Sequence, residues 1–428
     1  MLDSNRYSGG HFKPLFQADE YVGRVVRAKK EMESRGLDLL MVCDPSNMNW
    51  LTGYDGISYY VPQCVVVAES LAEPLWIGRP MDAGGALKTT WLKNDSILSW
   101  PESSIHRTDD HPFQHIMSIL RERHLLQCAN GKTLQLGLEM DHDYFTARAL
   151  REIEHSIKTH TDVVNLVDAS MLVNWLRLVK SDAELEIMRR AAEIANATMT
   201  AALERIAVGV RQCDVIGDAI KASVCGTAYA GEFPALGGFM LATGSDAMAA
   251  HLTYTDEQLL PNRGSFFELC GSHRRYHCPI ARTVFLGEPP SKFKTVETAV
   301  GESMTAALSA AIEGNTAEQV WEAFYAILNG KYGYTKVSRL GYSIGIGYSP
   351  DWGEHTVSIR PGDKTVLRKN MCFHFIAGMW MDDWGYELSE AIIIAGDRQP
   401  PECLHTPARK LFVKPGDEPA AKKSRSNN

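Results

Sequence analysis

The hydrophobic pattern of the sequence changes near residues 168–180, and this change most constrains how the chain can fold. Ser181 and Glu184 have the spacing of a capping box, which marks the start of a long helix with apolar residues at helical intervals and a stop at Gly209. Short apolar strands alternate with amphipathic helices before the change, and long helices accompany several strands after it. The pattern predicts two domains, because a chain of 428 residues is too long for one ordinary core.

Residues 1–170 are predicted to form an α/β domain. An amphipathic helix is expected over 18–35, followed directly by a buried strand in the segment DLLMVCD. Other apolar runs and periodic stretches predict strands at 64–68, 74–78 and 133–140 and helices near 112–124 and 142–155.

Residues 171–412 are predicted to form an α+β domain. A second capping box at 316–319 opens a helix that continues through Leu328, and four segments read as strands: SFFELCG, IARTVFLG, NMCFHFIAG and YELSEAIIIAG. Long helices with antiparallel strands between and after them predict helices packed against one face of a curved sheet. The tail, 413–428, contains little that can be buried and is expected to be disordered.

The overall composition narrows the possible partners. The net charge of −8, without a basic stripe, argues against nucleic acid as a partner. No segment has the length of apolar sequence that a signal peptide or a membrane span needs, so we expect a cytoplasmic protein that does not bind membranes. Nine cysteines without a CxxC pair favour reduced thiols over a zinc ribbon or a disulfide framework.

Four blocks of sequence resemble the pita-bread family, which includes creatinase, aminopeptidase P and other proteins like peptidase M24. They are NWLRLVKSDAELEIMRRAAEIANATM, GSDAMAAH, RGSFFELCGSHRRYHCPIARTVF and GYSIGIGYSP, in the order in which the family has them. The resemblance extends to an amino-terminal creatinase-type domain around DPSNMNWLTGYDG. It implies that the curved sheet carries the active site and that the protein is a homodimer.

The resemblance fails at the metal ligands of this family. Metal-dependent members hold two divalent ions with two aspartates, a histidine and two glutamates. The corresponding positions here are Glu268, Pro279, Tyr342, Ile376 and Glu390, of which only the last keeps the family's residue. Proline and isoleucine cannot bind a metal, so the resemblance implies the metal-free branch typified by creatinase, with no cofactor.

A single-metal site is the alternative that these residues leave open. His374 lies two residues before Ile376 and therefore faces the same side of a strand. A mononuclear site would then combine four side chains: His251, Glu268, His374 and Glu390.

Within the metal-free branch the sequence most resembles the ectoine hydrolases. The resemblance lies in NMNWLTGYDGISYYVPQCVVV, in the FELCG block and in Tyr342. It implies a hydrolase that opens the cyclic amidine of ectoine to N-acetyl-L-2,4-diaminobutyrate without metal, with a downstream deacetylase as a possible associate. The alternatives are a creatinase-like amidinohydrolase, a metal-dependent peptidase of the prolidase type and a non-catalytic domain that binds other proteins.

Three residues are candidates for the chemistry. His251 stands in the family's histidine block, and imidazole is suited to proton transfer near neutral pH. Glu268 lies in an apolar strand, where a carboxylate is costly unless it faces a pocket, and the alternative is a solvated strand face. The same argument applies to Glu390, whereas its neighbour Glu387 is expected to be solvated.

Three further residues of this domain are candidates for substrate binding. Tyr342 either offers a phenol to the substrate or fills the space that the metal leaves. Arg282 either clamps a substrate carboxylate or pairs with a strand neighbour at the surface. Asp246 either caps a turn or reaches a cationic substrate.

The amino-terminal domain supplies the last candidates. Tyr54, Asp55 and Tyr60 lie in the block that, in this family, can reach the active site of a partner subunit. The alternative for the aromatic residues is a place in the core of their own domain.

Overall fold

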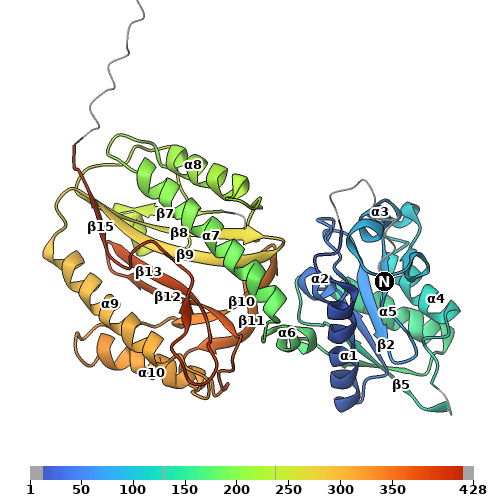
Figure 1. Cartoon of the computed structure of the whole chain (residues 1–428). Coiled ribbons are helices and arrows are strands. Elements are labelled where there is room, and N and C mark those ends of the chain that lie inside the picture. Colours follow the sequence, from blue (N-terminus) through green and yellow to red (C-terminus); the bar gives the residue numbers. More distant parts are fainter. Residues whose placement is uncertain (1–12, 129–130, 237, 418–428) are drawn as a thin grey trace, which may run out of the picture. The chain divides into compact units, whose positions relative to one another are not determined.

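The computed structural model describes residues 13–128, 131–236 and 238–417, which fold into two compact units divided between Arg177 and Leu178 (Figure 1). The sequence places the boundary at 170/171, so the short helix α6 (Leu172–Arg177) falls in the first unit instead of the second. No helix in the described part of the chain is long and apolar enough to cross a membrane.

The first unit is built on a six-stranded mixed sheet with the order β4-β3-β2-β1-β5-β6. Strand β1 pairs in parallel with β5 and antiparallel with β2. Side chains of α4 and α5 share one core with one face of this sheet. The bounds are α1 (Ala18–Ser34), β1 (Leu39–Val42), α2 (Pro45–Thr52), β2 (Cys64–Ala68), β3 (Leu75–Gly78), α3 (Pro80–Thr89), η1 (Asn94–Ser96), β4 (Ile97–Ser99), η2 (Glu102–Ser104), α4 (Pro112–Glu122), β5 (Leu134–Leu138), α5 (Ala147–His160) and β6 (Val164–Asp168).

Two helices of the first unit differ from the sequence prediction. Helix α5 begins after Thr146, which caps it by accepting the backbone N–H of Ala149, and not at residue 142. Helix α2 was not predicted, although Asp44 caps it, Pro45 follows at its first position and Gly53 ends it with φ +84. These are ordinary start and stop signals, and the eight-residue helix is too short to show a clear hydrophobic period.

The second unit holds a nine-stranded sheet with the main order β14-β13-β12-β10-β9-β8-β7. The pairs along this path are antiparallel, β11 pairs antiparallel with β10, and β15 pairs in parallel with β9. The bounds are β7 (Met240–Thr243), η4 (Gly244–Met248), β8 (Arg263–His273), β9 (Tyr276–Leu286), β10 (Gly341–Tyr348), β11 (Asp351–Ile359), β12 (Cys372–Trp380), β13 (Gly385–Ile393), β14 (Glu402–Cys403) and β15 (Phe412–Lys414).

This sheet is curved, as the sequence predicts. Strands β9 and β13 are separated by two strands along the sheet, yet Ser389 of β13 accepts the backbone N–H of Ala281 of β9 at 2.7 Å. Thr283 of β9 also donates its hydroxyl to the carbonyl oxygen of Glu387 at 2.9 Å. The two strands therefore meet across the concave side.

Four long helices cover the sheet: α7 (Asp182–Arg205), α8 (Gln212–Cys225), α9 (Ser291–Ala310) and α10 (Ala317–Leu328) (Figure 1). Both predicted capping boxes form, at Ser181–Glu184 and Thr316–Gln319, with side-chain and backbone bonds in each direction. Helices α9 and α10 share a core with β12 and β13. Helix α7 lies directly on β8, because a Cβ atom at Gly271 would come within 2.2 Å of the backbone of Ala191 and Ala195.

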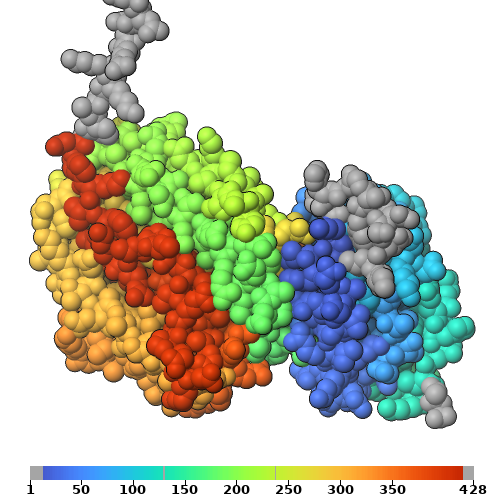
Figure 2. All heavy atoms as spheres, viewed as in Figure 1, coloured from blue at the N-terminus to red at the C-terminus, as the bar shows by residue number. Residues whose placement is uncertain are grey.

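The predicted disordered tail is wrong at its start. Val413 and Lys414 belong to β15 and pair with Phe285 and Leu286 of β9, so this segment lies against the second unit (red in Figure 2). Residues 418–428 lie outside the described part of the chain.

Candidate active site

A cavity of about 420 Å³ in the second unit brings together three of the predicted site residues. Glu268 of β8, Tyr342 of β10 and His251 line it. The remaining lining residues are Leu236, Gly238, Met240, Thr253, Arg339, Asp351 and Trp352. The volume is in the range of roughly 300–1,000 Å³ that small-molecule sites occupy.

Glu268 is a buried carboxyl in this cavity. It is 5% exposed and lies between Phe267 and Leu269, which are fully buried. Burial, together with a smaller contribution from the negative charge of Asp351, raises the pKa of Glu268 to about 8. The side chain is therefore protonated at neutral pH.

Tyr342 lines the cavity, and its hydroxyl oxygen has two nitrogen neighbours. The indole N–H of Trp352 donates to the Tyr342 hydroxyl oxygen at 2.8 Å, and His374 Nδ1 lies 3.0 Å from the same oxygen. Burial lowers the pKa of His374 to about 3. The neutral ring accepts the hydroxyl proton if Nδ1 is unprotonated and donates to the phenol oxygen if Nδ1 carries the proton, so the tautomer of His374 sets where the Tyr342 proton points.

Arg339 is a half-buried cation of the cavity that sequence reasoning missed. Its guanidinium carbon lies 4.4 Å from the centre of the Tyr342 ring, and Nη1 donates to the Ser358 hydroxyl at 3.0 Å. Burial lowers its pKa below the ordinary value of an arginine, and a guanidinium keeps its charge at physiological pH. Residue 339 precedes β10 in an irregular segment, where no sequence period indicates its direction.

Asp351 is the second residue that the sequence did not reveal. Its Oδ1 accepts the backbone N–H groups of Trp352 at 2.6 Å and Gly353 at 3.1 Å, while Oδ2 lies 2.7 Å from Nε2 of His355. Burial acts to raise its pKa, but the bonds from His355 and the backbone lower it overall. No motif or hydrophobic period in the sequence indicates that this aspartate, the first residue of β11, faces a cavity.

His251 lies at the exposed side of the cavity. It follows the 3-10 helix η4 in a turn and is solvent-accessible. Asp246, within η4, is also exposed, and its carbonyl oxygen accepts the backbone N–H of Ala249 at 3.0 Å. Asp246 does not line the cavity, which agrees with its alternative role in a turn.

The expectation that Arg282 is a substrate clamp or a surface residue is corrected by its surroundings. The side chain is fully buried. Its guanidinium donates to four backbone carbonyl oxygens, those of Ala281 (2.8 Å), Ser389 (2.7 Å), Pro407 (2.6 Å) and Ala408 (3.1 Å). Arg282 therefore ties β9 and β13 to the segment before β15 and uses four of its five N–H donors on the backbone. Arg282 does not line the cavity.

Glu390 is not brought to the cavity either. In the β12–β13 ladder Glu390 pairs with Phe375, while Ser389 pairs with Ile376. Side chains alternate along a strand, so Glu390 faces the side opposite to Ile376. Its carboxylate accepts the backbone N–H of His405 at 3.1 Å, and burial raises its pKa to about 7.

Glu387 is buried, which corrects the expectation of a solvated side chain. It is 1% exposed and shares the face of β13 that carries Ser389. Burial raises the pKa of Glu387 well above the ordinary value of a glutamate, and the charge of Glu268 adds to the effect.

The three candidates of the first unit have different surroundings. Tyr54 is buried against Trp76, with ring centres 5.1 Å apart, as the core alternative predicts. Asp55 is partly buried, and its backbone N–H donates to the Thr89 hydroxyl at 3.1 Å. Tyr60 is 69% exposed. Their possible role at a partner's site stays a prediction.

The residues at the family's ligand positions do not fit a metal. Pro279 and Ile376 offer no donor atom, Glu390 faces away, and Tyr342 is bonded to Trp352 and His374. Among the described residues no group of three or more His, Cys, Asp or Glu side chains is arranged to hold an ion. The alternative of a single-metal site formed by His251, Glu268, His374 and Glu390 is therefore not supported by the described residues either.

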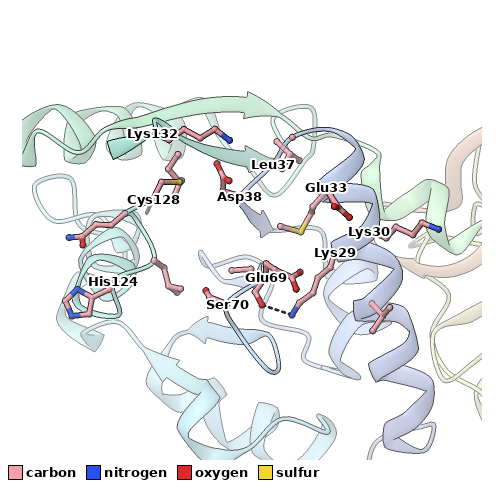
Figure 3. Close-up of a pocket in the computed structure, with 17 residues that line it drawn as sticks. Lys29, Lys30, Glu33, Leu37, Asp38, Glu69, Ser70, His124, Cys128 and Lys132 are labelled. Atoms are coloured by element: carbon pink, nitrogen blue, oxygen red, sulfur yellow. Dashed lines mark hydrogen bonds between the residues drawn. The ribbon is translucent and has the colours of Figure 1, made fainter. Parts of the chain in front are cut away.

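A larger cavity, of about 860 Å³, lies in the first unit (Figure 3). Residues of both charges line it, including Lys132 and Asp38. Lys29 donates to the backbone carbonyl oxygens of Glu69 at 3.3 Å and Leu71 at 2.6 Å. Its cation is thus used within the unit, and none of the site residues predicted from the sequence lines this cavity.

Two family models account for almost all of the folded chain. Residues 24–179 match the creatinase/prolidase N-terminal domain, and residues 186–395 match metallopeptidase family M24. The chain therefore belongs to this family of pita-bread enzymes and is a hydrolase.

Two relatives with similar sequences and one solved structure cover almost the whole chain. The ectoine hydrolase of Halomonas elongata is 41% identical over 93% of this chain and 98% of its own length. An uncharacterised hydrolase/peptidase of Sinorhizobium fredii is 36% identical over 93% and 98%. The prolidase of Thermococcus sibiricus matches in structure with a TM-score of 0.77 at 17% identity, covering 92% of this chain and 99% of that one, which supports the fold.

Proposed function

We propose that the protein hydrolyses ectoine, opening its cyclic amidine to N-acetyl-L-2,4-diaminobutyrate without a metal ion. The ectoine hydrolase of Halomonas elongata supports this choice, because the likeness extends over 98% of that protein. The lack of fit between the family's ligand positions and a metal supports the metal-free reaction.

One observation carries the proposal: the cavity holds a cation and two carboxyl groups around a space for a small molecule. Arg339 supplies the cation, and Asp351 and Glu268 supply the carboxyls. Ectoine is a small zwitterion with a carboxylate at one end and an amidinium ion at the other. Its carboxylate complements Arg339, and its amidinium complements Asp351 and Glu268.

Substrate binding prepares Glu268 for the reaction. Glu268 is protonated in the empty cavity because its pKa is raised to about 8. The positive charge of the amidinium lowers this pKa, so the carboxylate forms beside the electrophilic carbon. A protonated amidine is already electrophilic and needs facing negative charge more than a Lewis acid.

The ring then opens in two steps. The Glu268 carboxylate adds to the amidine carbon, and the ring C–N bond breaks as its nitrogen takes a proton from His251. Water adds to the same carbon and the bond to Glu268 breaks, so the water oxygen becomes the acetyl oxygen and the carboxylate is restored. One water proton returns to His251 and the other is taken up by the released amine. If Glu268 instead activates water, the products are the same, and mass spectrometry of acid-quenched enzyme finds no adduct on the Glu268 peptide.

The proposal also covers the oligomeric state of the protein, its location and the enzyme that acts after it. We expect a homodimer, as the family resemblance implies, in the cytoplasm, as the sequence predicts. The product carries an acetyl group on one nitrogen, and a deacetylase removes such a group. We therefore expect a deacetylase to act on the product and to associate with this enzyme.

Proton NMR of ectoine incubated with chelator-treated enzyme tests the reaction. Ring-opened N-acetyl-diaminobutyrate is the expected product. Creatine and a proline dipeptide, each with and without added manganese, serve as comparison substrates. Turnover of one of these but not of ectoine would overturn the proposal and leave the fold unaffected.

A further inference from the structure

Glu387 is the buried carboxyl of the second unit that the proposed reaction does not use. It is 1% exposed, and neither carboxylate oxygen has a hydrogen-bond partner among the described residues. A buried, ionised carboxylate without partners is costly, and such groups are rare in folded proteins. Glu387 therefore requires a chemical explanation.

Glu387 is a neighbour of Glu268 in the interior of the curved sheet. It shares a face of β13 with Ser389, whose hydroxyl oxygen accepts the backbone N–H of Ala281 at 2.7 Å. Ala281 is the residue that pairs with Glu268 across β8 and β9. The charge of Glu268 raises the pKa of Glu387, as expected for two carboxyls close together.

The charged groups that face Glu387 are Glu268 from β8 and Lys336 from the segment before β10. Lys336 Nζ donates to the Ser338 hydroxyl at 2.8 Å and to the carbonyl oxygen of Gly378 at 3.1 Å, and not to Glu387. Arg282 of the adjoining strand β9 donates only to backbone carbonyl oxygens. No cation therefore bonds to Glu387, and its surroundings favour the neutral acid.

Glu268, by contrast, needs a hydrogen-bond donor. Its carboxyl group receives no hydrogen bond from the described residues, so its ionised form would rely on the substrate alone. A neutral Glu387 has an O–H group that can donate to a neighbouring carboxylate.

We propose that Glu387 is a positioning residue that stays protonated and donates its O–H, directly or through one water, to the Glu268 carboxylate when Glu268 ionises. The proposal rests on the proposed function of Glu268. The Glu387 proton stays on its oxygen, and no covalent bond forms or breaks at this residue.

Infrared difference spectra recorded across pH test the protonation without measuring turnover. In the wild type, the carbonyl band of a protonated carboxyl should persist after Glu268 has ionised. Glu387→Gln should lose this band and Glu390→Gln should keep it. In Glu268→Gln the band should disappear at lower pH, because the charge that raises the Glu387 pKa is gone. A persistent band that survives in Glu387→Gln, or no such band at all, overturns the proposal.

Turnover of ectoine tests the hydrogen bond. Glutamine keeps an N–H donor, so Glu387→Gln should hold kcat/KM within about threefold, while Glu387→Leu should lower it roughly tenfold or more. The acidic limb of the pH profile should move to higher pH in Glu387→Leu alone. Equal losses in both variants contradict the proposal. If the wild type does not open ectoine, the proposed function fails and the infrared result alone decides the role of Glu387.

Discussion

At the scale of single residues, the cavity derives its chemistry from charges that come from separate segments. Glu268 lies in a strand, Arg339 precedes another, and Asp351 begins a third. Each has a different surrounding: Glu268 is buried without donors, Asp351 is held by backbone N–H groups, and Arg339 rests on an aromatic ring. These differences set which group is charged before substrate arrives.

Glu268→Gln should remove most of the activity. Glutamine keeps the shape but cannot act as nucleophile or base, so kcat should fall by roughly 10² or more. Steady-state kinetics measures the loss, and circular dichroism checks the fold. Glu390→Gln is the matched control, because that carboxyl faces away from the cavity, and it should retain turnover. Normal turnover in Glu268→Gln would remove Glu268 from the mechanism.

The pH profile of the free enzyme should follow Glu268. Since Glu268 must lose its proton to act and its pKa is raised to about 8, kcat/KM should rise with pH until about pH 8. The profile of kcat should have its limb at lower pH, because bound substrate lowers the same pKa. Coincident limbs would show that substrate charge does not act on Glu268.

Arg339→Met should weaken substrate binding more than it slows the reaction. The carboxylate held by Arg339 is remote from the amidine carbon, so KM should rise about tenfold or more with a smaller change in kcat. Arg360→Met, at an exposed arginine nearby, is the control. The carboxamide analogue of ectoine should show no difference between wild type and Arg339→Met, and a retained difference would assign Arg339 another role.

At the scale of elements, the close packing of α7 on β8 depends on one glycine. A Cβ at Gly271 would lie 2.2 Å from the backbone of α7, so Gly271→Ala should destabilise the fold by about 1–3 kcal/mol or more. Gly301→Ala in helix α9, where nothing lies within 4 Å of the added atom, should stabilise it by about 0.5–1 kcal/mol. Urea unfolding measures both, and effects of the same sign would contradict the packing argument.

Elements were more predictable than the directions of their side chains. The capping boxes at Ser181 and Thr316 and the apolar strands follow from local preferences, so the sequence located them. Glu390 was assigned to the cavity because a motif comparison does not fix strand register, and a shift of one residue reverses the face. Arg339 and Asp351 lie where the chain is irregular, and only the folded chain brings them to Glu268.

At the scale of the whole molecule, buried titratable groups should make stability depend on pH in both directions. Glu268 and Glu390 have folded-state pKa values raised to about 8 and about 7, so folding binds protons and stability is lost as pH rises from about 5 to 8. His374 and His277, lowered to about 3 and about 4, stay neutral when folded, so stability is lost as pH falls below about 6.5.

The melting temperature should therefore be highest near pH 5 to 6.5, where the two effects overlap. Scanning calorimetry in buffers of constant ionic strength measures this. Glu268→Gln should flatten the alkaline decline, because glutamine does not ionise. A wild-type melting temperature that rises steadily to pH 8 would contradict these carboxyl pKa values.

The register of β12 and β13 also determines where metal ligands could be introduced into this fold by design. Ile376 and Ser389 are paired across the two strands, and both side chains lie on the concave side. Directly opposed residues of this kind have Cβ atoms about 5 Å apart. Glutamates grafted at these two positions would converge, although the Ser389 change would remove the bond to Ala281. A design that relied on the native Glu390 would leave one ligand on the far side of the sheet.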